Sequence, residues 1–129
     1  MIDQEILASQ IKADRFPFPS EGNVTLAIRS ANYTLGPVML HLGMEPGSHI
    51  PAHIHEGVAE VLYIVEGDFI NEGKTYRPGD SLHVKAGHVH GPHTTEKGCK
   101  LLVLWTERTE SEAANLDDFV LPSAVKAAA

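Results

Sequence analysis

The stretch of sequence that decides the fold covers residues 47–67 and reads GSHIPAHIHEGVAEVLYIVEG. After Gly57 the side chains alternate in steps of two, which is the period of a β-strand. The two faces of that strand carry Val61, Tyr63 and Val65 on one side and Glu60, Leu62 and Ile64 on the other. The stretch therefore predicts a strand that follows a turn at Gly57 and forms a hairpin with the residues before it.

The same kind of sequence continues on both sides, from about Val24 to Trp105. Short runs rich in Val, Ile, Leu, Thr and Tyr are separated by Gly, Pro and Asn, which favour tight turns. Many short strands joined by turns indicate an all-β sandwich or barrel rather than a βαβ fold. The expected strands cover residues 24–31, 36–43, 48–55, 58–65, 68–76, 81–85, 88–94 and 99–106.

The two ends of the chain differ from this central part. Residues 5–11 predict a short helix, whereas the prolines of residues 16–19 exclude a helix and favour an extended arm. The sequence after Trp105 is charged and ends in alanines, but residues 119–121 are apolar enough to dock on the barrel or on a neighbouring subunit. The expected organisation is an arm at 1–20, a β-barrel domain at 21–108 and a tail at 109–129.

The composition limits the class of protein. A chain of 129 residues suits one domain that buries roughly two thirds of its unfolded surface, and the single cysteine, Cys99, forms no internal disulfide. The N-terminus lacks a signal-peptide pattern, and no apolar run approaches the roughly 20 residues of a membrane-spanning helix. We therefore expect a soluble, cytoplasmic protein. A net charge of −7 argues against nucleic acid or an anionic membrane as the partner.

Histidine is frequent, with 8 in the chain and seven of them between residues 49 and 93. His53 and His55 lie two apart, so their imidazoles share one face of a strand, and a hairpin brings the Glu60 carboxylate beside them. Imidazole and carboxylate together suit Fe, Mn, Ni, Zn or Cu, and two histidines with one carboxylate are the pattern of non-heme Fe(II) sites. Alone, the histidines also fit a polar surface or a hydrogen-bonded pair, and Glu60 fits a solvent-facing carboxylate.

A second segment, residues 79–90, offers further imidazoles on another expected strand, and with it the sequence resembles the cupin superfamily. The first cupin motif is matched without a gap by Gly47-x5-His53-x-His55-x4-Glu60-x6-Gly67, and the second by Gly79-x5-Lys85-x-Gly87-x2-His90. Lys85 stands where the family has proline, and Thr94 stands where it often has asparagine. Neither departure removes a donor atom.

The resemblance implies a small antiparallel β-barrel, a double-stranded β-helix of the jelly-roll type, that encloses one divalent metal ion per chain. The ligands it implies are His53, His55, Glu60 and His90, with Fe(II) favoured and Zn, Mn or Ni as alternatives. Four protein ligands on an octahedral ion leave two positions for a small-molecule substrate or for substrate and O₂.

The remaining histidines, together with Tyr63 and Cys99, have several expected roles. His49, His88 and Tyr63 are candidate acid/base or pocket groups, because His49 shares a face with His53 if the strand is regular and His88 shares one with His90. His93 points to the other face unless the strand bulges. His41 and His83 are expected in the core or between sheets, and Cys99 is expected to be a buried, unreactive thiol.

Three functions remain open at this point. Residues 87–103 resemble the small cupins related to the metal-binding domain of ChrR-type anti-sigma factors, whose relatives include dioxygenases that cleave diketones and hydroxylated aryl ketones. The favoured function is such an Fe(II) dioxygenase. The alternatives are an anti-sigma-type sensor, for which 20 N-terminal residues are too few to form the usual helical domain, and a non-oxidative isomerase or lyase. We also expect a homodimer, since an extended arm suits strand addition.

Overall fold

The computed structural model describes residues 1–2, 5–29, 38–108 and 119–122, with the backbone alone for residues 106–108. A short 3₁₀ turn, η1 (Ala8–Gln10), lies near the N-terminus. The strands are β1 (Asp14–Arg15), β2 (Val24–Ile28), β3 (Val38–Met44), β4 (His49–Ile50), β5 (His53–Ile54), β6 (Val58–Gly67), β7 (Phe69–Asn71), β8 (Lys74–Tyr76), β9 (Ser81–Val84), β10 (Val89–His90), β11 (His93–Thr94) and β12 (Cys99–Arg108).

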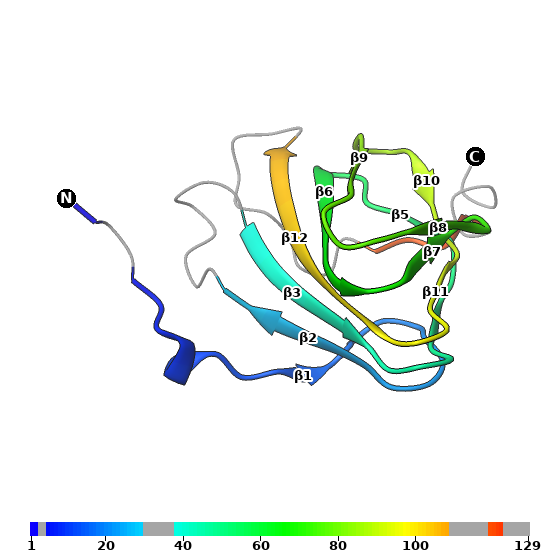
Figure 1. Ribbon diagram of the computed structural model, residues 1–129. Coiled ribbons are helices and arrows are strands. Elements are labelled where there is room, and N and C mark those ends of the chain that lie inside the picture. Colours follow the sequence, from blue (N-terminus) through cyan, green and yellow to red (C-terminus); the bar gives the residue numbers. More distant parts are fainter. Residues whose placement is uncertain (3–4, 30–37, 109–118, 123–129) are drawn as a thin grey trace.

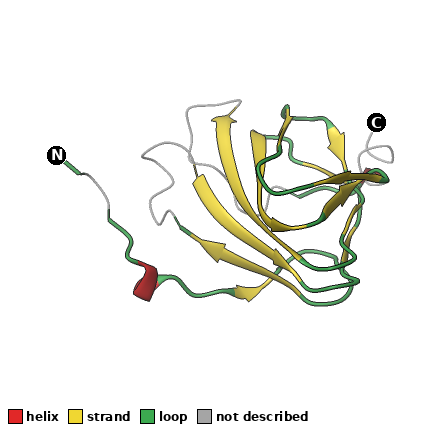
Figure 2. Ribbon diagram, viewed as in Figure 1, coloured by secondary structure: helices red, strands yellow, loops and turns green. Residues whose placement is uncertain are grey.

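The strands form three antiparallel sheets (Figure 1). The largest sheet has the order β1-β2-β3-β12-β6-β9, and across from it lie a four-stranded sheet, β4-β11-β7-β8, and the pair β10-β5. Figure 2 shows that strands and loops make up almost all of the described chain. The predicted all-β, jelly-roll-type fold is confirmed, although no ladder pair among the described residues joins these sheets into a closed barrel.

Most predicted strands are found, and the differences arise where a predicted strand is interrupted. The expected strand 48–55 is divided at Pro51 into β4 and β5, and the expected strand 88–94 is divided at Gly91 and Pro92 into β10 and β11. A proline cannot donate to a ladder, so these breaks end one pairing and let the chain begin another. The expected helix at 5–11 is only the short turn η1.

Some segments of the chain lie outside these sheets. The segment before β1 runs away from the body as an arm (Figure 1). Val120 docks on β5, where its N–H and C=O pair with those of Ile54 at 2.9 and 2.8 Å. The expected ends of strands at 30–31 and 36–37, and the tail at 109–118 and 123–129, lie outside the described residues. No helix in the described part is long and apolar enough to cross a membrane.

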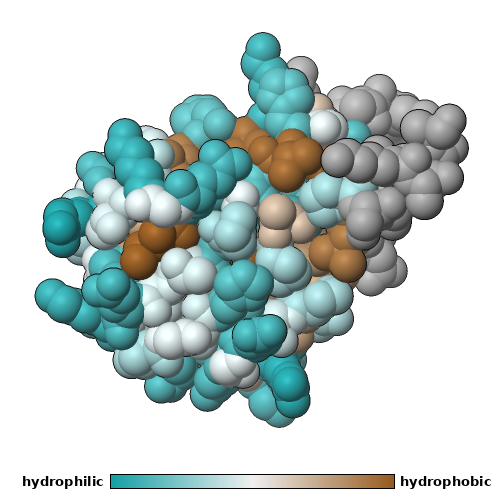
Figure 3. Space-filling model, turned by 90° about the vertical axis from the view of Figure 1, so that its right-hand side faces the viewer, coloured by the Kyte–Doolittle hydropathy of each residue, from teal (hydrophilic) through white to brown (hydrophobic). Residues whose placement is uncertain are grey.

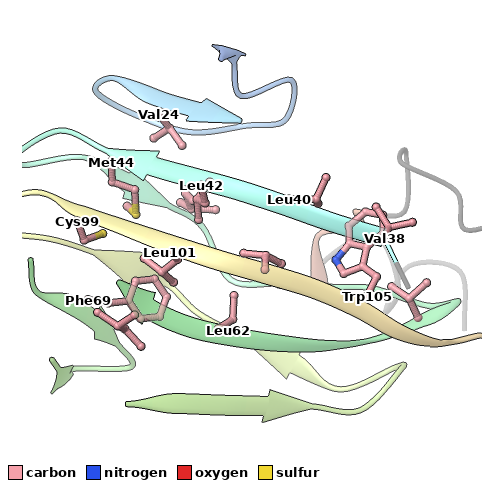
Figure 4. Packing of buried hydrophobic residues seen from close by; sticks show 14 residues of the cluster. Val24, Val38, Leu40, Leu42, Met44, Leu62, Phe69, Cys99, Leu101 and Trp105 are labelled. Carbon is pink, nitrogen blue, oxygen red and sulfur yellow. The ribbon is translucent and has the colours of Figure 1, made fainter. Parts of the chain in front are cut away.

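The core lies between the large sheet and the smaller sheets. Alternate residues of β3, β6 and β12 point inward, because side chains of a strand project to opposite faces in turn. Figure 4 shows Leu40, Leu42 and Leu101 packed between these strands, with Trp105 beside Val38. Ile50 and Phe69, from the four-stranded sheet, join the same cluster, so one continuous core holds both layers together.

A tight crossing joins β6 to the turn before β12. Gly67 has φ 81°, and a Cβ at this position would overlap the carbonyl oxygen of Gly98. Gly73 has nearly the same conformation, with φ 80°, but a Cβ there would meet nothing within 4 Å. Gly67 is therefore required by both backbone conformation and space, whereas Gly73 is required by conformation alone.

The buried carboxylate of Asp68 fixes the same turn. Its Oδ1 accepts hydrogen bonds from Thr95 Oγ1 and the Lys97 N–H, each at 2.9 Å, and its Oδ2 accepts one from the Glu96 N–H at 3.0 Å. Burial raises the pKa of Asp68, but these donors stabilise the carboxylate more, so its pKa is lowered from the usual 3.8. Asp68 thus ties the 95–98 turn to the end of β6.

Candidate metal centre

Three buried histidines meet where β5 pairs with β10. In this antiparallel pair His53 lies opposite His90, and His55 follows directly after β5. The ring centroids of His53 and His90 are 4.1 Å apart, and those of His53 and His55 are 4.9 Å apart. One ligand atom from each of the three lies within 4.8 Å of the others, so the group could hold a metal ion.

Glu60 brings a carboxylate to the same place from β6. It is 5% exposed, and its Oε2 lies 2.8 Å from His55 Nε2 and accepts a hydrogen bond of 2.9 Å from Trp105 Nε1. Its Oε1 lies 3.9 Å from His90 Nδ1. The four side chains expected as ligands are therefore neighbours; their role in metal binding is taken up below.

The electrostatics of this cluster favour neutral imidazoles at His53 and His90 and an ionised carboxylate at Glu60. Burial lowers the pKa of His53 to about 3, helped by the neighbouring His90, and burial also lowers the pKa of His90. For Glu60, burial raises the pKa, but the hydrogen bond and charge of His55, with His90 and Trp105, lower it more. These are the protonation states in which imidazole and carboxylate bind a metal.

The donor set fits a divalent metal ion. Both ring nitrogens of His90 are buried without a hydrogen-bond partner, which is costly unless a ligand satisfies one of them. The Nδ1 of His53 is 2.8 Å from the Pro51 carbonyl oxygen, which leaves Nε2 as the free donor and holds the ring in place. Ligand atoms about 2.1 Å from one ion are at most about 4.2 Å apart, so small side-chain shifts bring these donors into coordination distance.

A small cavity of about 50 Å³ adjoins the cluster. His53, His55 and Glu60 line it together with His93. The rest of its wall is apolar and aromatic, and no Lys or Arg lines it among the described residues; the wall includes Leu40, Leu42, Ile50, Leu62, Val103 and Trp105. A metal here would have a largely apolar cavity beside it.

Aromatic side chains from both ends of the chain cover this centre. The Phe119 ring stacks on His53 with centroids 4.1 Å apart and an interplanar angle of 17°. Phe18 stacks on Phe119 at 4.6 Å, and Phe16 contacts both rings edge-on. Figure 3 shows one outer face of the molecule as mainly hydrophilic with small hydrophobic patches.

The structure does not bring the three acid/base candidates to this cavity. His49 belongs to β4, where Ile50 points inward, because the break at Pro51 changes which residues face the core. His88 is exposed before β10, and Tyr63 is 43% exposed on the outer face of β6. None of the three lines the cavity beside the cluster.

Two of the remaining histidines also differ from expectation. His83 is exposed on β9, and His41 is half-buried on the outer face of β3, so neither lies in the core. In contrast, Cys99 is buried as expected, and burial raises the pKa of its thiol to about 11.

Strand alternation predicted the wrong orientation for the side chain of His93. It is 3% exposed, and its ring lies 4.8 Å from that of His90 and 5.3 Å from that of His53. Residues three apart point to opposite faces of a regular strand, but Gly91 and Pro92 separate β10 from β11, so both histidines point inward. Burial, with His90 and His53 nearby, lowers the pKa of His93 well below 6.5. The Gly-Pro pair was the sequence signal for this change.

Comparison with known proteins agrees with this fold. The sequence model of the cupin domain matches residues 40–107, whereas none of the curated proteins matches the chain. The chain is similar in structure to acetylacetone dioxygenase from Acinetobacter johnsonii, with TM-score 0.62, 16% identity and coverage of 82% of this chain and 74% of that chain. It is also similar to the polyketide cyclase RemF from Streptomyces resistomycificus, with TM-score 0.67, 21% identity and coverage of 91% and 89%.

A third similar structure is the complex of Rhodobacter sphaeroides SigE with the anti-sigma ChrR. The TM-score is 0.59 at 20% identity, and the match covers 77% of this chain and 51% of that chain. At such identities the three likenesses support the fold alone, and they leave the reaction to be argued from the site.

Proposed function

Because the chain belongs to the cupin family, whose domain matches residues 40–107, we propose that it is a metal-dependent enzyme that acts on a small molecule. The reaction we propose is an Fe(II)-dependent dioxygenation of a small dicarbonyl or hydroxylated aryl ketone. The observation that carries this proposal is the buried cluster of His53, His55 and His90 with Glu60 beside an apolar cavity. Mixed imidazole and carboxylate donors with open positions are typical of non-heme iron oxygenases.

The residues of the chain prepare this site for such chemistry. The Pro51 carbonyl orients His53, and the Trp105 indole N–H orients Glu60, so the donors keep fixed directions. The apolar wall excludes bulk water, which strengthens polar interactions with a bound substrate. A bound Fe(II) ion would supply Lewis acidity and the redox chemistry for reaction with O₂.

The other two functions have less support from the site. A non-oxidative isomerase or lyase needs a group that moves a proton. The predicted candidates His49, His88 and Tyr63 lie away from the cavity, and among the described residues His93 is the one imidazole outside the donor cluster that lines it. A sensor of the anti-sigma type does not account for the cavity beside the cluster. The likeness to an acetylacetone dioxygenase is consistent with the proposal, at the level of fold.

Elemental analysis tests the metal centre. Protein purified without added metal or chelator should contain roughly one equivalent of iron, and His53→Ala should lose it. His83→Ala, which removes an exposed histidine from β9, is the matched control and should keep the metal. Absence of metal from the parent protein would contradict the site.

Oxygen consumption then tests the reaction. The Fe(II)-loaded parent should take up O₂ with at least one member of a panel of β-diketones and hydroxylated aryl ketones. Turnover of such a compound under strictly anaerobic conditions would favour the non-oxidative alternative. Stoichiometric capture of a sigma-like factor, with no turnover, would favour the sensor.

We also propose a homodimer. Ile2 and Leu7 are 81% and 52% exposed on the N-terminal arm, and Tyr63 and Val65 are 43% and 47% exposed on the outer face of the large sheet. Apolar side chains exposed in this way are typical of surfaces that bind a partner. Light scattering coupled to size exclusion should give twice the chain mass of 14.0 kDa, and a monomer would contradict it.

A further inference from the structure

His93 is a buried polar side chain that the proposed metal centre does not use. It is 3% exposed, and its Nδ1 has no hydrogen-bond partner among the described residues. It also stands outside the group of three histidines whose ligand atoms lie within 4.8 Å of one another. A buried polar atom without a partner is rare in native proteins and points to a ligand or water that completes it.

The ring of His93 is firmly placed by its neighbours. It lies 4.8 Å from the Phe69 ring and 4.8 Å from the His90 ring, and its strand, β11, is paired on both sides, with β4 and β7. A side chain held between a central strand and an aromatic ring keeps its direction when a ligand binds. Such fixed polar groups orient ligands in otherwise apolar pockets.

The cavity offers few other polar groups to a ligand. Apart from the donor cluster of His53, His55 and Glu60, and from Trp105, whose indole N–H is bonded to Glu60, His93 is the one polar side chain that lines it among the described residues. With no Lys or Arg in this lining, the cavity disfavours ligands that carry several negative charges. It suits a compact oxygen compound with at most one negative charge and an apolar body.

We infer that His93 binds the small molecule that occupies this cavity, through a hydrogen bond to one of its oxygens. The inference rests on the proposed function, because the metal places the ligand beside His93. An imidazole donates a hydrogen bond to a carbonyl or enolate oxygen and accepts one from a hydroxyl, so one residue serves both substrate types. A site with such a contact discriminates strongly against analogues that lack the oxygen.

The test uses the Co(II)-loaded protein, whose visible spectrum changes when a ligand reaches the metal. The probe is acetohydroxamic acid, a compact chelator with two adjacent oxygens. His93→Phe keeps an aromatic ring but removes the hydrogen bond. His93→Leu also removes the hydrogen bond, with a side chain smaller than that of phenylalanine. His93→Gln keeps a hydrogen-bonding group. His83→Phe is the matched control, since it changes an exposed histidine outside the cavity.

We expect all of these proteins to bind one equivalent of Co(II). The dissociation constant of the probe should rise about tenfold in His93→Phe and His93→Leu, as expected for one lost hydrogen bond, and change less than about threefold in His93→Gln and His83→Phe. Equal probe affinity in the parent and whichever apolar variant folds would overturn the inference and leave the metal centre intact. So would a parent that binds Co(II) but not the probe.

Two further results separate this inference from the proposed function. Loss of Co(II) from the apolar variants, with His93→Gln also affected, would make His93 a metal ligand and would overturn the inference. A parent that takes up no Co(II) would refute the metal centre itself, and the inference with it. Thermal unfolding of each metal-free variant checks that the compared proteins are folded.

Discussion

Replacing Asp68 with asparagine should destabilise the protein by about 2–4 kcal/mol. The carboxylate accepts three hydrogen bonds at 2.9–3.0 Å, from Thr95 Oγ1 and the N–H groups of Glu96 and Lys97. Asparagine keeps one acceptor oxygen, but its NH₂ group then faces a donor. Each hydrogen bond to a charged group contributes roughly 1.5–3 kcal/mol, and an unsatisfied buried N–H costs about 1–3 kcal/mol.

Urea denaturation at pH 7 measures this difference, and the melting temperature should fall by roughly 10 °C. The matched control is Asp80→Asn, which changes an exposed carboxylate that accepts one hydrogen bond of 2.8 Å from the Arg77 N–H. It should cost about 1 kcal/mol or less. If Asp68→Asn destabilised the protein no more than this control, the role assigned to Asp68 in fixing the 95–98 turn would be wrong.

The stability difference between the parent and Asp68→Asn should depend on pH. The pKa of Asp68 is lower in the folded protein than its usual 3.8, so the folded state binds fewer protons than the unfolded chain in that interval. The stabilisation is therefore present above pH 3.8 and is lost as the pH falls through the folded-state value. The difference between the parent and Asp68→Asn should shrink in acid; a difference that grows would contradict the argument.

Three other predictions concern the backbone, the histidines and the aromatic cover. Gly67→Ala should destabilise the protein by more than about 3 kcal/mol in chemical denaturation, because its Cβ would overlap the Gly98 carbonyl, whereas Gly73→Ala should cost only about 1 kcal/mol. Equal costs would refute the close approach. The metal-free protein should lose stability as the pH falls from 6.5 towards 3, because His53 has its pKa lowered to about 3 and only the unfolded chain takes up the proton in that window; a urea midpoint unchanged between pH 7 and 5 would contradict this. Phe119→Ala should let a chelator remove bound metal about tenfold faster, because the ring that covers His53 is gone, and an unchanged rate would mean that the metal leaves by another route.

Much of the fold could be predicted because strand alternation is a local property of the chain. The faces of β6 follow directly from the two-residue period of residues 58–65, and Glu60 and Leu62 point inward as this period requires. The spacing of His53, His55, Glu60 and His90 matched the cupin motifs, and the structure brings these four side chains together. Local rules and motif spacing therefore identified the centre of the cluster.

The surroundings of the cluster could not be predicted by the same rules. His49 and His93 were both assigned by continuing the alternation through a proline, and in both cases the strand ends there and a new one begins in another sheet. Asp68 gave no sequence signal, because its partners lie 27 to 29 residues away. Phe119 was expected to dock, but its contact with His53 depends on tertiary packing.

Trp105 has a consequence that reaches beyond its hydrogen bond to Glu60. It is the chain's single tryptophan, and its ring lies 5.3 Å from that of His55. The long-wavelength fluorescence of the whole protein therefore originates beside the candidate ligands. Paramagnetic Fe(II) or Co(II) bound by His55 should quench the emission, whereas diamagnetic Zn(II) should mainly shift it. The unlabelled protein thus carries a built-in optical probe that distinguishes a paramagnetic from a diamagnetic bound metal.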